Sequence, residues 1–224
     1  MTHRVFVTGG TGYMGSRLIP VLLNRGHRVT ALVREQSRSK LTAACDVVAG
    51  NPLEGDSYAA HVTGHDTLVH LVGVAHPGPS KAREFIDIDL RSGLEAVRVA
   101  SRTGVGHFIY LSVAQPAPVM KTYIDVRASC ESAIRQAGLN ATVLRPWYVL
   151  GPGHRWPLAL VPFYWLAEQF SGTREGALRL GLVTINQMIE ALAVAVESAP
   201  AGMRIVGVPE IRGGFPARLQ TSMV

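Results

Sequence analysis

Cysteine is scarce in this sequence. Cys45 and Cys130 are the two cysteines among 224 residues, and two thiols in a chain of this length do not make a disulfide scaffold. Neither cysteine has a metal-ligand neighbour at a standard spacing, so we predict no metal site. The low cysteine content favours a reducing compartment, and we expect the protein to be cytoplasmic.

Long apolar runs are also missing. The longest, residues 156–167, is interrupted by two prolines and falls well short of the ~20 apolar residues that span a bilayer. We therefore predict no transmembrane segment and expect a core or interface helix there. The alternatives for this run are an apolar wall of a substrate pocket and a segment that rests on a membrane. The N-terminal residues lack the long apolar core of a signal peptide.

Charge is low and unevenly placed. Charged residues make up 17% and hydrophobic residues 47% of the chain, which excludes disorder and predicts one globular domain with a large core. Residues 1–50 hold seven Lys or Arg against two acidic residues, so five of the six net positive charges lie there. Either a nucleic acid or a bound polyphosphate can account for such an excess.

The first motif decides between them. A β-rich run, Arg4–Thr8, leads into Gly9, Gly12 and Gly15, and a helical pattern and a second β-rich run follow. In this context one glycine permits a tight turn, another lets the backbone approach a pyrophosphate, and the third lets helix and strand pack closely. The amides at the helix N-terminus then bind the phosphates. A dinucleotide site is predicted; the alternative is a tight loop that binds nothing.

The same alternation of strand and helix continues along the chain. Further strands are predicted at 46–50, 66–73, 106–113, 141–146 and 202–208, and further helices at 80–103 and 121–137. This pattern predicts an α/β protein with a Rossmann-type, doubly wound parallel sheet and a short C-terminal helical extension. Phosphate binding then explains the basic N-terminal region, and we predict no nucleic-acid partner.

The end of the second predicted strand bears on the choice of coenzyme. A site for NAD places an acidic residue there to hold the ribose hydroxyls. Here Val33 takes that position, Arg34 follows it, and Ser37 and two further basic residues come soon after. A guanidinium beside hydroxyls suits a 2′-phosphate, so NADP is favoured over NAD. Glu35 is the residue that could still serve a free ribose.

Six short stretches together resemble a known family. They read TGGTGYMG, VVAGNPLE, LVHLVG, YLS, YIDVRASCE and TVLRPWYVLGPG. They are similar to the atypical and extended short-chain dehydrogenase/reductases, and most of all to epimerase-like relatives of the 39 kDa subunit of respiratory complex I and to NmrA-like proteins. The resemblance covers about 4–155 and weakly continues to 210. It implies a single NAD(P)-binding domain, 1–224, with a nucleotide-binding core at 1–150 and a small substrate or cap region at 151–224.

The resemblance implies a full set of coenzyme contacts, each carried by a residue that matches a family motif. The pyrophosphate would be wrapped by Gly9, Thr11, Gly12, Tyr13 and Met14, and the 2′-phosphate would be held by Arg34. On the adenosine side, Asn51 would lie near the adenine in place of the family's usual aspartate, and the ribose would be lined by Leu71, Val72 and Gly73. The nicotinamide would be flanked by Pro146 and Val149.

The family's catalytic pattern is only partly kept. Tyr123 matches the tyrosine that exchanges a proton with the substrate oxygen, and Arg127 replaces the lysine that holds the nicotinamide ribose. Ser112 lies near the position of a hydroxyl that orients the substrate, although the family usually takes that hydroxyl from a later residue. Asp89 stands where the preceding helix usually has an asparagine. Arginine keeps the positive charge but cannot lose its proton, so this change is not conservative.

Three readings of this helix remain open. Tyr123 and Arg127 can form a weakened catalytic pair, or the coenzyme site can persist without turnover. Alternatively, Arg127 pairs with Glu131 on an ordinary helix surface, as i, i+4 residues do, while Tyr123 covers the sheet. In the C-terminal region His154 is either a second acid or base or a structural residue. Asn186 and Gln187 lie near the corner where the family usually has an aspartate.

Two functions follow from these readings. The first is an NADP-dependent oxidoreductase or epimerase, with Tyr123 as acid and base on a small carbonyl or alcohol substrate. The second is a non-catalytic NAD(P)-binding sensor or an assembly or regulatory subunit. The short substrate region implies a small pocket or one formed with a partner, either another protein or a second copy of this chain.

Overall fold

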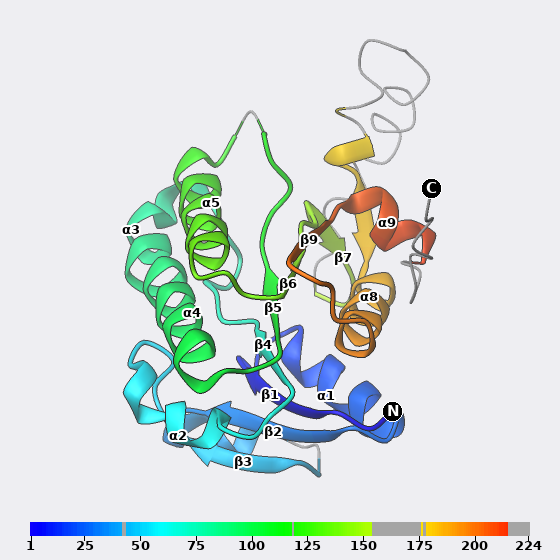
Figure 1. Ribbon diagram of the computed structural model, residues 1–224. Coiled ribbons are helices and arrows are strands. Elements are labelled where there is room, and N and C mark those ends of the chain that lie inside the picture. The colour runs from blue at the N-terminus through cyan, green and yellow to red at the C-terminus, as the bar shows by residue number, and fades with distance from the viewer. Residues whose placement is uncertain (42–43, 118, 154–175, 177, 215–224) are drawn as a thin grey trace.

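A parallel sheet forms the centre of the molecule (Figure 1). The computed structural model describes residues 1–41, 44–117, 119–153, 176 and 178–214, and within these ranges seven strands join in the order β3-β2-β1-β4-β5-β6-β9. The strands are β1 (Arg4–Thr8), β2 (Arg28–Val33), β3 (Asp46–Ala49), β4 (Thr67–His70), β5 (His107–Leu111), β6 (Ala141–Leu144) and β9 (Met203–Val206). All pairs in this sheet are parallel, so the predicted doubly wound fold is confirmed.

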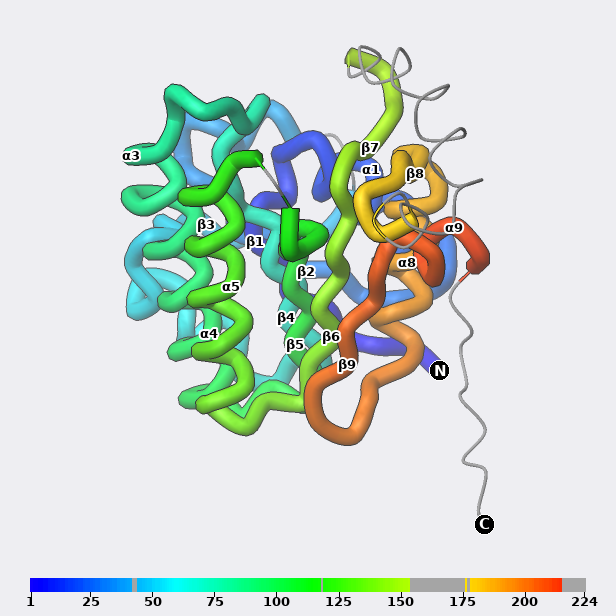
Figure 2. The backbone as a smooth tube through the Cα atoms, turned by 90° about the horizontal axis from the view of Figure 1, so that it is seen from above, coloured from blue at the N-terminus to red at the C-terminus, as the bar shows by residue number. Residues whose placement is uncertain are grey.

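Helices cover both faces of the sheet. The helices are α1 (Gly15–Asn24), α2 (Ala59–Val62), α3 (Ala82–Glu84), α4 (Arg91–Thr103), α5 (Lys121–Gln136), α8 (Ile185–Glu197) and α9 (Val208–Gly213). Figure 2 shows α4 and α5 on one side of the strands and α1 and α8 on the other. Because neighbouring side chains of β1 point to opposite faces, Val5 and Val7 pack with the α1 and α8 side while Phe6 packs with the α4 and α5 side.

The long helix predicted at 80–103 is built from several helical segments. A 3₁₀ turn, Pro79–Lys81, leads through α3 into a π-helical segment, Phe85–Leu90, which continues as α4. π-Helical turns are rare and concentrate at functional sites, because the extra residue turns side chains away from the regular helical positions. Asp89 lies in this segment and is fully buried.

A second, smaller pair of strands was not predicted. Strand β7 (Tyr148–Leu150) pairs in parallel with β8 (Leu182–Thr184), which directly precedes α8. Thr184 caps α8, because the amide of Gln187 donates to its hydroxyl at 3.2 Å and the Gln187 side chain accepts from the Thr184 amide at 2.8 Å. Gln187 therefore has a structural role at the helix start.

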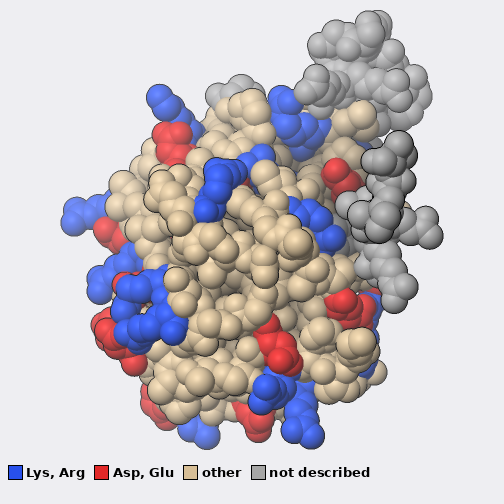
Figure 3. Space-filling model, viewed as in Figure 1, with Lys and Arg blue, Asp and Glu red and all other residues tan. Residues whose placement is uncertain are grey.

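The described part of the chain contains no helix that is both long and apolar enough to cross a bilayer. His154 and the apolar run 156–167 lie outside the described residues. On the face seen in Figure 3, the Lys and Arg side chains of the described residues stand in separate groups around a broad uncharged centre.

Candidate functional site

The strand order reverses between β1 and β4, and the candidate site lies along the carboxyl ends of the strands at this point. Ligands of doubly wound sheets bind at such switch points. The glycine turn, residues 9–14, begins here. It is tight, because the amide of Gly12 donates to the Gly9 carbonyl at 2.9 Å and the amide of Ser16 donates to the Gly12 carbonyl at 3.0 Å. A Cβ added at Gly15 would lie 2.4 Å from the Gly9 carbonyl oxygen, so only glycine fits there.

One cavity, which we call the Arg34 cavity, opens on one side of this turn with a volume of about 390 Å³. Most of the residues predicted to hold the pyrophosphate, the 2′-phosphate and the adenosine meet in its wall, but not Tyr13 and Met14. They are Gly9, Thr11, Gly12, Arg34, Asn51, Leu71, Val72 and Gly73. Lys81 also lines this cavity and was not predicted from the sequence. Val33, at the acid position of an NAD site, is buried at the end of β2, whereas Arg34 is exposed.

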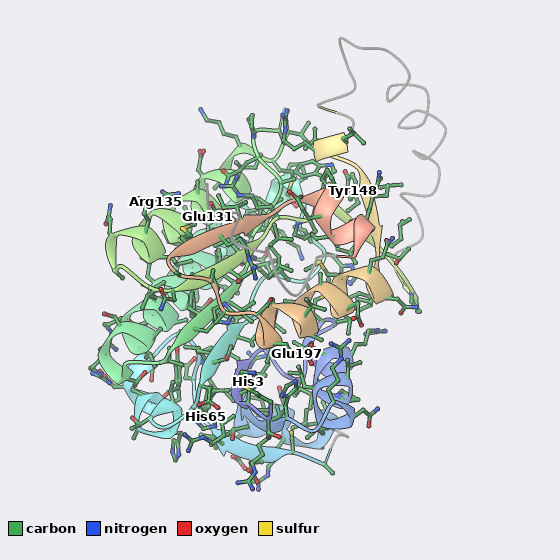
Figure 4. The ribbon with its side chains drawn as sticks, turned by 45° about the vertical axis from the view of Figure 1, so that its right-hand side comes forward. His3, His65, Glu131, Arg135, Tyr148 and Glu197 are labelled. Carbon is green, nitrogen blue, oxygen red and sulfur yellow. The ribbon has the colours of Figure 1, made fainter. Side chains whose placement is uncertain are left out.

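A second cavity, which we call the Tyr123 cavity, has a volume of about 290 Å³. All remaining predicted site residues line it: Tyr13, Met14, Ser112, Tyr123, Arg127, Pro146 and Val149. Trp147 and Tyr148 add aromatic surface. In Figure 4, Tyr148 lies in the upper part of the view, well above Glu197 and His3. Tyr13 and Met14 continue the glycine turn, so this turn contributes to both cavities.

Arg127 is buried and held in one orientation. Its side chain is 6% exposed; Nη1 donates to the Leu111 carbonyl at 2.8 Å, and Nη2 forms an ion pair with the Asp89 carboxylate. Burial acts to lower the pKa of Arg127, but the Tyr123, Tyr110 and Asp89 side chains raise it well above its ordinary value. The guanidinium is therefore a permanent cation in the wall of the Tyr123 cavity.

The alternative in which Arg127 pairs with Glu131 on the helix surface is wrong. Glu131 is buried and forms its ion pair with Arg145, while its Oε1 accepts hydrogen bonds from the Ser112 hydroxyl at 2.5 Å and from Gln115 at 2.9 Å. The two side chains share the inner side of α5, but Arg127 turns toward Asp89 and Glu131 toward Arg145. The Ser112 hydroxyl donates to a carboxylate, so it serves this network as well as lining the cavity.

Tyr123 lies on the first turn of α5 and is half-buried. Its ring packs against Phe85, with 4.9 Å between ring centroids, and the Arg127 guanidinium carbon lies 5.1 Å from the Tyr123 ring centroid. The π-helical segment supplies Phe85 and so helps to position the tyrosine. A cation within about 6 Å of an aromatic ring attracts it, which fixes the ring further.

His76 is a cavity residue that the sequence reasoning missed. It lines the Tyr123 cavity in a left-handed backbone conformation with φ of 50°. A residue other than glycine rarely adopts this conformation, and such strain concentrates at functional sites. The one sequence signal is its place in the turn-forming stretch AHPGP, which predicts a loop without indicating what the loop lines.

The residues present fit a nicotinamide dinucleotide. The glycine turn presents backbone without side chains to the two cavities, and Arg34 and Lys81 supply positive charge to the Arg34 cavity. In the Tyr123 cavity, the buried Arg127 guanidinium supplies a positive charge to the wall.

Solved structures share this fold. The Bordetella bronchiseptica enzyme WbmH in complex with NAD⁺ superposes with a TM-score of 0.68 at 20% sequence identity, covering 94% of this chain and 79% of that one. This likeness shows that the fold is that of the extended short-chain dehydrogenase/reductases and says nothing about the substrate.

Relatives with assigned roles match parts of the chain. The 3 beta-hydroxysteroid dehydrogenase/Delta 5→4-isomerase of Mycobacterium tuberculosis is 31% identical over 115 residues, which cover 49% of this chain and 31% of that protein. The photosystem II assembly factor Ycf39 of Synechocystis is 23% identical over 145 residues, covering 63% of this chain and 44% of that protein. The chain thus spans less than half the length of these relatives.

The profile of the NAD(P)H-binding family matches residues 9–154. That range contains the glycine turn and most of the residues that line the two cavities. The predicted resemblance is confirmed: this chain belongs to the NAD(P)H-binding family and has the fold of the extended short-chain dehydrogenase/reductases.

Proposed function

We propose that the protein is an NADP(H)-dependent oxidoreductase, or an epimerase that uses the coenzyme transiently, and that it acts on a small carbonyl or alcohol substrate. One observation carries this proposal: the glycine turn contributes Gly9 and Gly12 to the Arg34 cavity and Tyr13 and Met14 to the Tyr123 cavity. A dinucleotide whose pyrophosphate binds this turn would place its adenosine in the first cavity and its nicotinamide in the second.

The reaction at the Tyr123 cavity then depends on the coenzyme, the Tyr123 hydroxyl and the apolar lining. The bound coenzyme would supply or accept a hydride. The Tyr123 hydroxyl would donate a proton to a carbonyl oxygen during reduction and accept it back during oxidation. Met14, Trp147 and Val149 line the cavity with apolar surface, which excludes water and suits an apolar substrate.

We expect Tyr123→Phe to lower turnover about 100-fold, because phenylalanine fills the same space but has no proton to donate. Coenzyme affinity should stay within about twofold, since the ring and its contacts with Phe85 and Arg127 remain. The measurement is the rate of NADPH oxidation with a panel of quinones, aldehydes and ketones, together with a fluorescence titration of NADPH.

Tyr58→Phe is the matched control. Tyr58 is fully buried on the α4 side of the sheet, outside both cavities, and its hydroxyl has no hydrogen-bond partner among the described residues. Its loss should leave turnover unchanged. Turnover that persists in Tyr123→Phe would show that Tyr123 is not the acid and base.

The preference for NADP is assigned to Arg34. Arg34→Ala should weaken NADPH binding about tenfold to 100-fold, because a charge-assisted hydrogen bond to phosphate is worth about 1.5–3 kcal/mol. NADH, which lacks the 2′-phosphate, should bind as before. The control is Arg28→Ala at the opposite, amino end of β2, where the side chain is also exposed. An equal loss of NADPH and NADH affinity would remove Arg34 as the selector.

A second candidate function is a non-catalytic NAD(P)-binding sensor or assembly subunit. The ion pair of Arg127 with Asp89 favours it, because the cation that the family uses in catalysis is engaged within the protein. Tight NADPH binding without turnover on the whole panel, in the wild type and in Tyr123→Phe alike, would support this function over the first.

A further inference from the structure

Asp89 and Arg127 are two departures from the family pattern, and the structure brings them into direct contact. Asp89 comes from the π-helical segment and is fully buried, and Arg127 comes from α5. Their side chains form an ion pair through Oδ1 and Nη2. Where the family has an uncharged asparagine and a lysine, this chain has a carboxylate and a guanidinium.

The Asp89 carboxylate also binds the loop after β4. Its Oδ2 accepts a hydrogen bond from the Val74 amide at 2.9 Å. The backbone comes close enough because Gly73 has no side chain: a Cβ there would lie 2.7 Å from Arg127 Nη2 and 3.1 Å from Asp89 Oδ1. Asp89 therefore connects the loop after β4, the π-helical segment and α5.

The ion pair lies between the two cavities. Gly73 and Val74, which contact Asp89, line the Arg34 cavity, and Arg127 lines the Tyr123 cavity. A change in the ion pair therefore alters the walls of both cavities.

The buried Arg127 guanidinium depends on the Asp89 carboxylate as its counter-charge. A buried guanidinium without a counter-charge is strongly unfavourable, whereas a paired and hydrogen-bonded one is tolerated. Burial raises the pKa of Asp89, and the Arg127 guanidinium and the Val74 amide oppose that rise and favour the carboxylate. Nη1 of Arg127 donates to the Leu111 carbonyl while Nη2 donates to the Asp89 carboxylate. The single ammonium group of a lysine cannot reach both acceptors at once in this geometry.

We propose that Asp89 is a positioning residue, and that its carboxylate and the Arg127 guanidinium are a single linked replacement of the asparagine and lysine of the family. Asp89 compensates the charge of Arg127 and fixes its orientation in the wall of the Tyr123 cavity, where the ribose beside the nicotinamide would bind. This inference rests on the proposed coenzyme site and names the residue pair that shapes its nicotinamide end.

A double-mutant cycle tests the linkage. Asp89→Asn leaves Arg127 buried without a counter-charge, and Arg127→Lys loses the fork, so each single change should raise the dissociation constant for NADPH by about tenfold or more. The double variant Asp89→Asn/Arg127→Lys restores the family arrangement and should bind NADPH within about threefold of the wild type, because changes at contacting residues do not add.

A second readout separates positioning from packing. The oxidised nicotinamide ring is a cation and the reduced ring is not, so an uncompensated Arg127 should repel NADP⁺ more than NADPH. In Asp89→Asn the ratio of the NADP⁺ to the NADPH dissociation constant should rise about tenfold over that of the wild type. The double variant Asp89→Leu/Arg127→Met should keep the melting temperature of the wild type but bind NADPH poorly. The apolar side chains fill the same space but carry no charge to hold the coenzyme.

The outcomes are distinguishable. If the wild type binds neither coenzyme, the proposed function fails. If the wild type binds NADPH but the two single changes simply add in the double variant, the linkage is wrong although the site is right. If Asp89→Asn does not fold, a folded Asp89→Asn/Arg127→Lys protein that binds NADPH supports the linkage, and an unfolded one overturns it.

Discussion

Gly15→Ala should abolish coenzyme binding and, with it, any turnover. The added Cβ would lie 2.4 Å from the Gly9 carbonyl oxygen and 2.7 Å from Gly10 Cα, and both atoms belong to backbone that cannot rotate away. The start of α1 must therefore move from the end of β1, which opens the turn that would bind the pyrophosphate. Such overpacking should also cost about 1–3 kcal/mol of folding free energy.

Titration with NADPH, far-ultraviolet circular dichroism and a melting curve together check this prediction. The variant should keep the helical signal while it loses binding. Gly213→Ala is the matched control, because a Cβ at Gly213, the last residue of α9, meets no atom within 4 Å. NADPH binding of wild-type strength in Gly15→Ala would show that the turn does not hold the phosphates, and the assignment of both cavities would then lose its basis.

The fold and the outline of the site could be predicted because both depend on short segments of sequence. Strand β1 has an apolar centre, Val5–Val7, β4 contains Leu68 and Val69, and the glycine turn has its spacing within eight residues. Once the strands are known to be parallel, their carboxyl ends must share one edge of the sheet. Residues as distant in sequence as Arg34 and Gly73 therefore line one cavity, as the resemblance implied.

The partner of Arg127 could not be predicted in the same way. Glu131 has the i, i+4 spacing that predicts a pair on an isolated helix, but that rule holds for solvent-exposed side chains. Here α5 packs against α4 and the sheet, and both charged residues are buried. Each then pairs with a charge from a distant part of the chain, Arg127 with Asp89 of the π-helical segment and Glu131 with Arg145, which follows β6.

The strand pair β7–β8 was missed for a related reason. Its two strands have three residues each and are joined by more than 30 residues of chain. Segments this short carry too little alternation to be identified, and among the described elements they pack against α8 and α9. Predicted cavity residues such as Gly9, Arg34 and Leu71 directly follow strands of the large sheet, whereas His76, which was missed, lies on an irregular loop.

Acid should destabilise the protein well before its carboxylates are protonated. His70 and His107 are almost completely buried, at 1% and 2% exposure. Burial lowers the pKa of His70 to about 3, with a further contribution from Arg127, and lowers the pKa of His107 to about 4, with contributions from Arg204 and His3. Nδ1 of His107 has no hydrogen-bond partner among the described residues, so a proton gained there would be unpaired.

The sign and size of the effect follow from these values. In the unfolded chain each histidine takes up a proton near pH 6.5, whereas in the folded protein it remains neutral down to about pH 3–4. Stability from these groups is therefore present above pH 6.5 and lost as the pH falls below it, by about 1.4 kcal/mol per pH unit for each histidine. From pH 7 to pH 5 the pair should cost about 4 kcal/mol, a large share of the roughly 5–15 kcal/mol that stabilises a domain.

Urea unfolding measured at intervals from pH 7.5 to 5 checks this expectation, because the slope of the unfolding free energy against pH counts the protons taken up on unfolding. His70→Gln and His107→Gln should each reduce that slope by about one proton per molecule below pH 6. His61→Gln, at an exposed position, is the control and should leave it unchanged. An unaltered slope in both buried variants would mean that His70 and His107 are already protonated in the folded protein. The interior at β4 and β5 would then hold charged imidazoles, although the observed packing, with Arg127 beside His70, should exclude them.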